Sequence, residues 1–292
     1  MLVDCHCHLL PDLDDGAQSL DEALALARQE VASGVTHAVV TPHGSSRNLQ
    51  QTLQLRDQRL AELRQALQRE NIPLELIPGL EYYADGKGAI EAIDEPGCRC
   101  GYPDVPQRPL LVELPMSLDI TFAANLLFTM QLKHVTLILA HPERYRGFAT
   151  HFSDLIDLLW KGMYLQFNVT SFQRSLRHWL TRRVIFKLLA AAPEQILIGS
   201  DAHHSELRPA GLALAQQAIT DVFDDDTWEL VSYRNAQTIH LVPCPNSFRR
   251  TPRSPFAQGI MGTQKKPVAG ATGWEDLVAG AGFEPATFSL WG

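Results

Sequence analysis

Histidine and aspartate are concentrated near the N-terminus, in the segment DCHCHLLPDLDDG at residues 4–16. Imidazole nitrogens and carboxylate oxygens are both metal ligands, and a mixed set suits divalent transition metals. Side chains at positions i and i+2 of an extended segment point to the same side, so His6 and His8 can face one metal ion. The segment therefore predicts part of a metal site, which other parts of the chain must complete.

The cysteines that alternate with these histidines point to the opposite side of such a segment. An alternative is a structural zinc site in which Cys5 and Cys7 join Cys98 and Cys100. Paired cysteines in structural zinc sites are usually separated by two or more residues, whereas both pairs here are separated by one. We therefore expect Cys5 and Cys7 to be small, buried side chains without a metal.

The elements that must position these ligands alternate between strand and helix. Seven apolar segments are predicted strands: Met1–Cys5, Val35–Pro42, Leu74–Gly79, Leu110–Pro115, Val135–Ala140, Met163–Asn168 and Ile196–Ser200. Helix-length segments connect them, and a capping-box pattern begins one helix at Ser19. Strands joined in this way are parallel and buried on both faces. The pattern predicts an α/β fold, a closed βα barrel of seven parallel strands, with an open doubly wound sheet as the competing architecture.

Polar residues gather where the predicted strands end. In chain order they are His6, His8, His43, Glu81, Glu113, His141, Asp201 and His203, and the sixth strand ends in Asn168. One such residue is usually a hydrogen-bonded loop residue, but here six of seven strands supply a histidine or carboxylate. The carboxyl ends of parallel strands meet at one rim. Carboxylates crowded there would repel one another, and divalent metals relieve that repulsion.

The composition of the whole chain limits the class of protein. A net charge of −8 at pH 7 argues against a nucleic-acid-binding surface. A membrane span needs about 18 consecutive apolar residues, and the sequence has no such run. The N-terminus lacks the basic and apolar regions of a signal peptide. Five cysteines in 292 residues fit a reducing compartment. We expect a cytoplasmic protein, and nothing in the composition indicates its oligomeric state.

Six motifs resemble those of one known family. They are DCHCHLLPDLDDGAQS at 4–19, TPH at 41–43, GLEYY at 79–83, VELP at 112–115, AHPERY at 140–145 and GSDAHHSELRP at 199–209. In order and spacing the chain resembles the polymerase-and-histidinol-phosphatase (PHP) superfamily. It looks most like the bacterial manganese-dependent tyrosine-protein phosphatases that control capsule and exopolysaccharide synthesis. The resemblance covers about residues 1–240 and implies a distorted seven-stranded, TIM-barrel-like fold with a three-metal site.

Transferred position by position, the resemblance implies nine metal ligands: His6, His8, Asp14, His43, Glu81, Glu113, His141, Asp201 and His203. Asp15 is the alternative to Asp14. The resemblance also implies that Arg144 and Arg208 bind the phosphate, since a guanidinium fork matches a pair of phosphate oxygens. The implied cofactor is two or three Mn²⁺ ions, with Fe or Zn as alternatives. The implied partner is a phosphotyrosine-bearing bacterial tyrosine kinase of exopolysaccharide or capsule synthesis.

Other functions remain open beside this interpretation. A PHP metal phosphoesterase acting on a small molecule such as histidinol phosphate would use the same ligands. CPNSFRR at 244–250 has the C-x5-R spacing of cysteine-based tyrosine phosphatases, in which a thiolate attacks phosphorus. That loop needs backbone amides around the phosphate, whereas Pro245 removes one and the segment has no glycine. A non-catalytic, metal-dependent binding module is disfavoured because no ligand position has been lost.

The composition changes after the predicted barrel, which we assign to residues 1–243. From Pro245 onward, 12 of 48 residues are glycine or proline, against 37 of 292 in the whole chain, which predicts disorder for 244–292. GFEP at 282–285 can be encoded by GGGTTCGAACCC, which contains the T-arm sequence of a transfer-RNA gene. This tail is therefore either a non-native product of read-through into such a gene or a genuine flexible segment that docks a partner.

Overall fold

Parallel strands form the centre of the protein. The computed structural model describes residues 1–84, 91–105, 108–118, 120–239 and 241. Its strands are β1 (Val3–Cys7), β2 (His37–Val40), β3 (His43–Gly44), β4 (Glu75–Pro78), β5 (Glu81–Tyr83), β6 (Leu110–Glu113), β7 (Leu137–Ala140), β8 (Tyr164–Asn168) and β9 (Ile196–Gly199). They are hydrogen-bonded into two sheets, ordered β1-β2-β4 and β3-β5-β6-β7-β8-β9, and every pairing is parallel.

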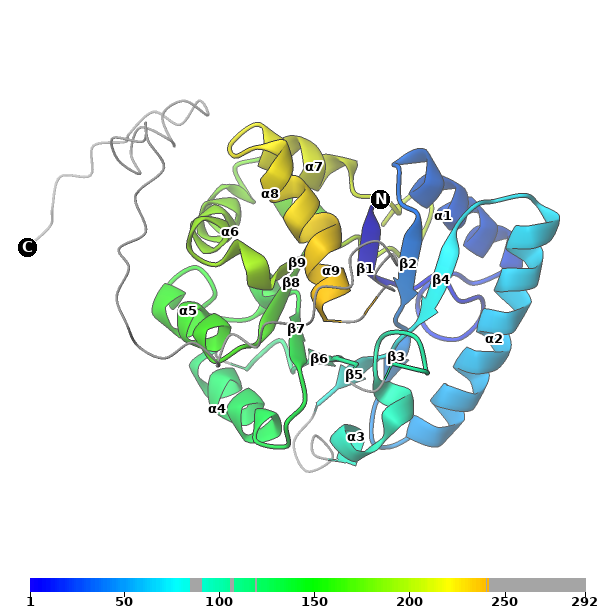
Figure 1. Ribbon diagram of the computed structural model, residues 1–292, viewed down its shortest axis with the longest axis horizontal. Helices are drawn as coiled ribbons and strands as arrows, with labels where there is room; N and C mark the ends of the chain where they lie inside the picture. Colours follow the sequence, from blue (N-terminus) through cyan, green and yellow to red (C-terminus); the bar gives the residue numbers. More distant parts are fainter. Residues whose placement is uncertain (85–90, 106–107, 119, 240, 242–292) are drawn as a thin grey trace, which may run out of the picture.

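Helices lie outside these strands (Figure 1). They are α1 (Leu20–Ala32), α2 (Leu49–Arg69), α3 (Glu91–Asp94), α4 (Ile120–Gln131), α5 (Phe152–Trp160), α6 (Trp179–Ala191), α7 (Ala213–Thr220), α8 (Asp225–Glu229) and α9 (Asn235–Thr238). The predicted start of α1 is confirmed, since the Ser19 hydroxyl accepts a hydrogen bond from the Glu22 amide at 3.2 Å. Short 3₁₀ turns, η3 (Pro142–Arg144) and η4 (Val169–Phe172), follow β7 and β8.

The α/β class and all seven predicted strands are present. However, the strands form two separate parallel sheets of three and six strands instead of one seven-stranded barrel. β2 and β4 are each followed by an additional short strand, β3 and β5, and these belong to the other sheet. Proline explains the breaks, because it cannot donate to a strand ladder: β2 ends before Pro42 and β4 ends at Pro78. A parallel bridge from Cys7 to Ala202 links β1 to the segment after β9.

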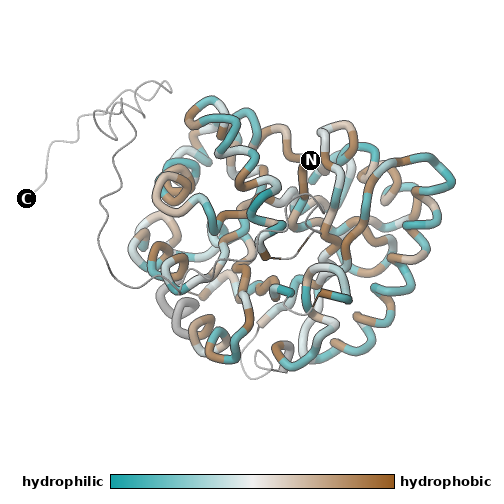
Figure 2. The backbone as a smooth tube through the Cα atoms, in the orientation of Figure 1, coloured by the Kyte–Doolittle hydropathy of each residue, from teal (hydrophilic) through white to brown (hydrophobic). Residues whose placement is uncertain are grey.

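The strands and the inner faces of the helices form the hydrophobic core. Every residue of β1, β6, β7 and β9 is buried. The helices alternate hydrophobic and hydrophilic residues along their length, as amphipathic helices covering a sheet do (Figure 2). Among the described residues, no helix is long and apolar enough to cross a membrane.

The cysteines of the described residues belong to this core. Cys5, Cys7, Cys98 and Cys100 are free and buried, as predicted for the first two. Burial raises the pKa of the Cys5 and Cys7 thiols well above the ordinary value. No group of potential metal ligands in the described part of the chain contains two cysteines, so the four-cysteine zinc site is not formed there.

Candidate metal centre

The polar residues predicted at the strand ends come together in one buried cluster. His6 lies on β1, His43 and Glu81 begin β3 and β5, and Glu113 ends β6. His8 and His141 directly follow β1 and β7, and Asp201 and His203 lie two and four residues after the end of β9. All eight are buried apart from His43, whose side chain is 35% exposed. They occur in four overlapping groups whose potential ligand atoms lie within 4.8 Å of one another.

The Glu81 carboxylate lies at the middle of this cluster. Its Oε2 is 3.1 Å from His6 Nε2, 3.3 Å from His8 Nε2 and 3.1 Å from His43 Nδ1. That oxygen is nevertheless buried without a well-formed hydrogen bond. His6 Nε2 and His8 Nε2 are 3.1 Å apart. Two nitrogens bound at right angles to one metal, at about 2.1 Å each, would be separated by about 3 Å. These spacings fit donors that converge on cations.

Hydrogen bonds behind the imidazoles fix which nitrogen faces the cluster. The Nδ1–H groups of three histidines donate away from it, His6 to Gln166 Oε1 at 2.8 Å, His8 to Asp14 Oδ2 at 2.8 Å and His203 to the Asp201 carbonyl at 2.9 Å. In a neutral imidazole held in this way, the Nε2 atom carries the lone pair, and it faces the cluster. Metal-bound histidines are oriented in this way by carboxylate, amide or carbonyl partners.

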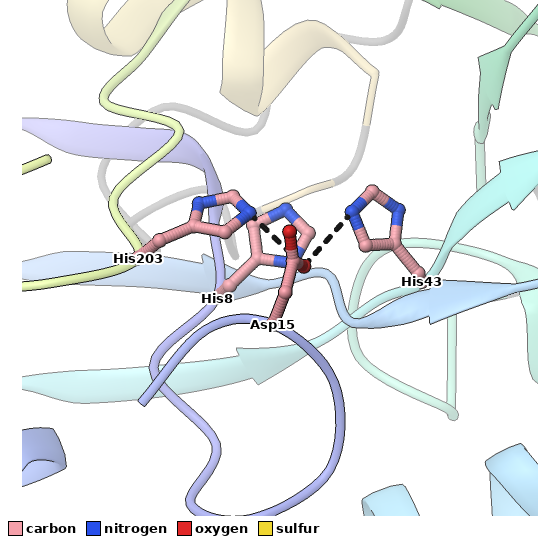
Figure 3. A group of neighbouring side chains, drawn as sticks. All are labelled: His8, Asp15, His43 and His203. Carbon is pink, nitrogen blue, oxygen red and sulfur yellow. Dashed lines mark ion pairs between the residues drawn. The ribbon is translucent and has the colours of Figure 1, made fainter. Parts of the chain in front are cut away.

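Asp14 and Asp15 occupy different positions, although they are adjacent in sequence. Asp15 Oδ1 lies 3.4 Å from His43 Nε2 and 3.3 Å from His203 Nε2, in the group drawn in Figure 3. Asp14 uses both oxygens behind the cluster: Oδ2 accepts from His8 Nδ1 and the His43 amide, and Oδ1 accepts from the Gly16 amide. The geometry therefore favours Asp15, the alternative in the sequence prediction, as the carboxylate that faces a metal.

The buried carboxylates of the cluster are stabilised by nearby positive charge, as the pKa shifts of Glu81 and His8 show. Burial alone would lower the pKa of His8, but Asp14 and Glu81 raise it well above its ordinary value. Burial alone would raise the pKa of Glu81, but His6 and its neighbouring imidazoles hold it well below the ordinary value. Burial and the nearby Glu81 raise the pKa of Glu113 to about 7. Divalent cations would stabilise the same carboxylates while the imidazoles remain neutral.

The backbone at the site has two residues with positive φ and two glycines that approach neighbouring residues closely. His141 and Asp201 have φ values of 31° and 53°, in the left-handed region that is uncommon for residues other than glycine. A Cβ on Gly199 would lie 2.7 Å from the His6 Cβ, and one on Gly16 would lie 2.3 Å from the His8 carbonyl oxygen. These glycines allow the two ligand-bearing segments to pack against β1 and the residues that follow it.

Asp201 separates the cluster from a neighbouring pocket of about 520 Å³. Its Oδ1 faces His6 and His8, at 3.7 and 3.6 Å. Its Oδ2 lies 2.5 Å from Arg208 Nη2 and 3.5 Å from Arg144 Nη1. Both predicted phosphate-binding arginines line this pocket, and their side chains are partly exposed, 38% for Arg208 and 45% for Arg144. The structure thus brings both arginines beside the candidate metal cluster.

Gln166 and Asn168, on β8, support the site from behind and were not predicted as functional. Gln166 Oε1 accepts from His6, its Nε2 donates to Asn168 Oδ1 at 3.0 Å, and Asn168 Nδ2 donates to Asp201 Oδ2 at 2.6 Å. Because the carboxylate only accepts, the direction of the whole chain of hydrogen bonds is fixed. A glutamine within the apolar run MYLQFN was the available signal, since a buried amide needs polar partners.

Comparison with known proteins identifies the family. Residues 2–240 match the family described as "Capsular polysaccharide synthesis, CpsB/CapC". The chain belongs to the CpsB/CapC family. A similar relative in this family is the putative tyrosine-protein phosphatase CapC of Staphylococcus aureus, 30% identical over 220 residues, or 71% of this chain and 79% of the relative. The tyrosine-protein phosphatase YwqE of Bacillus subtilis strain 168 is 28% identical over 220 residues, which again cover 71% of this chain and 79% of the relative.

Solved structures agree with this membership. The chain resembles a structure described with YwqE from Bacillus subtilis and CpsB from Streptococcus pneumoniae, "unique metal-dependent tyrosine phosphatases", with a TM-score of 0.67 and 25% identity. The match covers 82% of this chain and 95% of that one. A phosphotriesterase homology protein from Escherichia coli has a TM-score of 0.55 at 10% identity, which concerns the fold alone. The CpsB/CapC chain therefore shares its α/β architecture with phosphotriesterase-like proteins.

Proposed function

We propose that this protein is a metal-dependent protein-tyrosine phosphatase of capsule or exopolysaccharide synthesis. The observation that carries the proposal is the convergence of three imidazole nitrogens on the buried Glu81 Oε2, within 3.3 Å, without a well-formed hydrogen bond. Such an arrangement is costly unless cations occupy the space between the donors. Membership of the CpsB/CapC family, and relatives named as tyrosine-protein phosphatases, support the reaction.

The proposed ligand set is His6, His8, Asp15, His43, Glu81, Glu113, His141, Asp201 and His203. Its four carboxylates carry four negative charges when ionised, which two divalent ions would balance. Five imidazoles and four carboxylates form a mixed nitrogen and oxygen set that suits Mn²⁺, with Fe or Zn as alternatives. When bound, such ions activate water for attack on phosphorus and neutralise charge on the phosphoryl oxygens. Asp14 is proposed to hold His8 in the tautomer that leaves Nε2 free.

On the substrate side, the proposed roles belong to Arg144 and Arg208. Each guanidinium contacts the Asp201 carboxylate through one nitrogen, and each side chain is partly exposed. The remaining N–H groups of each guanidinium can donate to the phosphate oxygens, where negative charge is concentrated during the transfer. Asp201 holds both groups in place, which reduces the conformational freedom lost on binding. The leaving group is the tyrosine phenolate, whose parent pKa is about 10.

The proposed physiological partner is a phosphotyrosine-bearing bacterial tyrosine kinase. The support is the family, whose description refers to capsular polysaccharide synthesis. A phosphotyrosine on a protein surface must reach the ligand cluster, and the arginine-lined pocket beside Asp201 provides an approach. We further propose a cytoplasmic location, consistent with the composition of the chain.

The competing function is hydrolysis of a small phosphate ester by the same metals. Turnover of a phosphotyrosyl peptide and of histidinol phosphate should therefore be compared at equal Mn²⁺ concentration. We expect kcat/KM on the peptide to exceed that on histidinol phosphate by orders of magnitude. The reverse preference would assign the chain to the small-molecule branch. The C-x5-R segment lies outside the described residues, and Cys244→Ser should leave peptide turnover unchanged.

A further inference from the structure

The pocket beside the candidate metal centre is larger and more cationic than one phosphate requires. It has a volume of about 520 Å³, and its lining includes Arg144, Arg208 and a third arginine, Arg177. Pockets of a few hundred cubic ångströms accept groups larger than a phosphate. Arg177 lies in the connection between η4 and α6, so it reaches the pocket from a different part of the chain than the other two.

Arg177 differs from the other two arginines in its surroundings. Arg144 and Arg208 both contact Asp201, whereas Arg177 is exposed and has no ion pair with any residue that the structure describes. The lining has three arginines against two acids: Asp201 pairs with Arg144 and Arg208, and one oxygen of Glu143 accepts from the Asn168 amide and the Ser171 hydroxyl. The charge left facing the pocket is therefore positive, and an anionic group is its natural complement.

The rest of the lining favours a polypeptide over a free ion. Thr181 adds a neutral hydroxyl that can donate and accept hydrogen bonds, and the Ser171 hydroxyl, which donates to Glu143, can still accept one. Next to the pocket arginines in sequence lie the exposed apolar side chains of Leu176 and Leu207, 98% and 83% exposed. A small anion would leave these leucines in water, whereas a peptide that extends across the pocket can cover them. The combination fits a phosphotyrosyl peptide that also carries a nearby anion.

We propose that this pocket binds the chain flanking the phosphotyrosine, with Arg177 recognising a second anionic group on that chain. The second group is a carboxylate of Asp or Glu or another phosphate, since both present oxygens to a guanidinium. Arg177 is thus a specificity-determining residue that does not contact the reacting phosphate. The inference rests on the proposed phosphatase function and adds a sequence preference to it.

The test measures kcat/KM for Arg177→Ala and wild type on four substrates at low ionic strength. These are p-nitrophenyl phosphate, a phosphotyrosyl peptide flanked by glutamines, the same peptide flanked by glutamates, and one with a second phosphotyrosine. For wild type we expect about a fivefold preference for the anionic peptides, the size of a favourable exposed ion pair. Arg177→Ala should lose that preference and leave the glutamine peptide and p-nitrophenyl phosphate unchanged. The two anionic peptides distinguish the carboxylate from the phosphate.

Arg174→Ala is the matched control, because Arg174 lies three residues away, is 67% exposed and pairs with Asp221 outside the pocket. It should behave as wild type on all four substrates. Equal losses on every substrate in Arg177→Ala would place Arg177 at the reacting phosphate and overturn the inference, as would an unchanged peptide preference. A wild type inactive on every substrate would refute the proposed phosphatase instead. In that case, equal affinity of wild type and Arg177→Ala for a labelled glutamate-flanked phosphonate peptide would refute the pocket separately.

Discussion

The Nδ1–H of His8 donates to Asp14 Oδ2 across 2.8 Å, and the neighbouring Asp15 faces the metal cluster instead. The two aspartates therefore have different proposed roles, one orienting a ligand and one acting as a ligand. Asp15→Ala should lower the number of bound Mn²⁺ ions per chain. Asp14→Ala should keep that number but weaken affinity by roughly 10- to 100-fold, as for other partners of metal-binding histidines.

Metal content at saturating Mn²⁺, measured by mass spectrometry, and affinity, measured by calorimetry, distinguish the two roles. A loss of one ion in Asp14→Ala, together with full occupancy in Asp15→Ala, would reverse the assignment. It would also restore Asp14 as the ligand, in agreement with the first choice made from the sequence.

The amide chain on β8 leads to a second prediction. Gln166→Leu removes the acceptor for His6 Nδ1–H and leaves Asn168 Oδ1 without its donor. His6 is then free to change tautomer, so we expect Mn²⁺ affinity to fall by about 10- to 100-fold. Gln195→Leu is the control, because Gln195 also donates from a partly buried amide, to the Met163 carbonyl, but lies away from the cluster.

Both variants should lower the free energy of unfolding, since each removes hydrogen bonds in the protein interior. Only Gln166→Leu should change metal affinity. If calorimetry shows the same Mn²⁺ affinity for Gln166→Leu and wild type, the β8 amides have a structural role alone.

Glu30, a buried carboxyl that is not among the proposed ligands, provides a pH-dependent prediction. It is fully buried on α1 beside Asp4, and burial followed by the charge of Asp4 raises its pKa well above the ordinary 4.5. The folded protein thus holds this proton to a higher pH than the unfolded chain does. The contribution of Glu30 to stability is therefore present below about pH 4.5 and declines as pH rises toward the folded pKa.

Glu30→Gln removes this titration while keeping a side chain that can donate to Asp4. The variant should gain stability relative to wild type as pH rises above 5, measured by urea unfolding of chelated protein at several pH values. Glu62→Gln, at an exposed position on α2, should follow wild type. Parallel curves for Glu30→Gln and wild type would show that Glu30 does not hold its proton.

The C-terminal segment is the subject of a fourth prediction. The assignment of residues 244–292 as a separate tail lies outside the described residues, and all proposed ligands lie before it. Truncation after residue 248 should therefore preserve folding, metal content and kcat/KM on a phosphotyrosyl peptide. Limited proteolysis of the full chain should remove this tail first. An insoluble or inactive truncated protein would contradict the prediction.

The strand ends of the site could be predicted because periodicity and chemistry agree there. His6 and His8 are two residues apart on an extended segment, and their Nε2 atoms indeed converge to 3.1 Å. The loop that follows has no such period, so the choice between Asp14 and Asp15 depends on how the chain turns at Gly16, against the His8 carbonyl. That packing is a tertiary relationship, which local sequence does not encode.

The short strands β3 and β5 and the role of Gln166 were not predicted from the sequence, because all of them depend on contacts between distant parts of the chain. β3 and β5 contain only two and three residues, too few to show an alternating pattern. Their place in the second sheet depends on the breaks at Pro42 and Pro78, and hence on long-range pairing. The role of Gln166 likewise depends on His6, which lies 160 residues away in sequence.

The most direct test of the central claim combines metal content with activity. Protein stripped by a strong chelator should be titrated with Mn²⁺ while bound metal and phosphotyrosyl-peptide turnover are measured in the same samples. We expect turnover to be lost on stripping and to return in step with bound metal, and we expect His141→Ala to remain folded but poorly active at every metal concentration. Full turnover by metal-free protein would contradict the account.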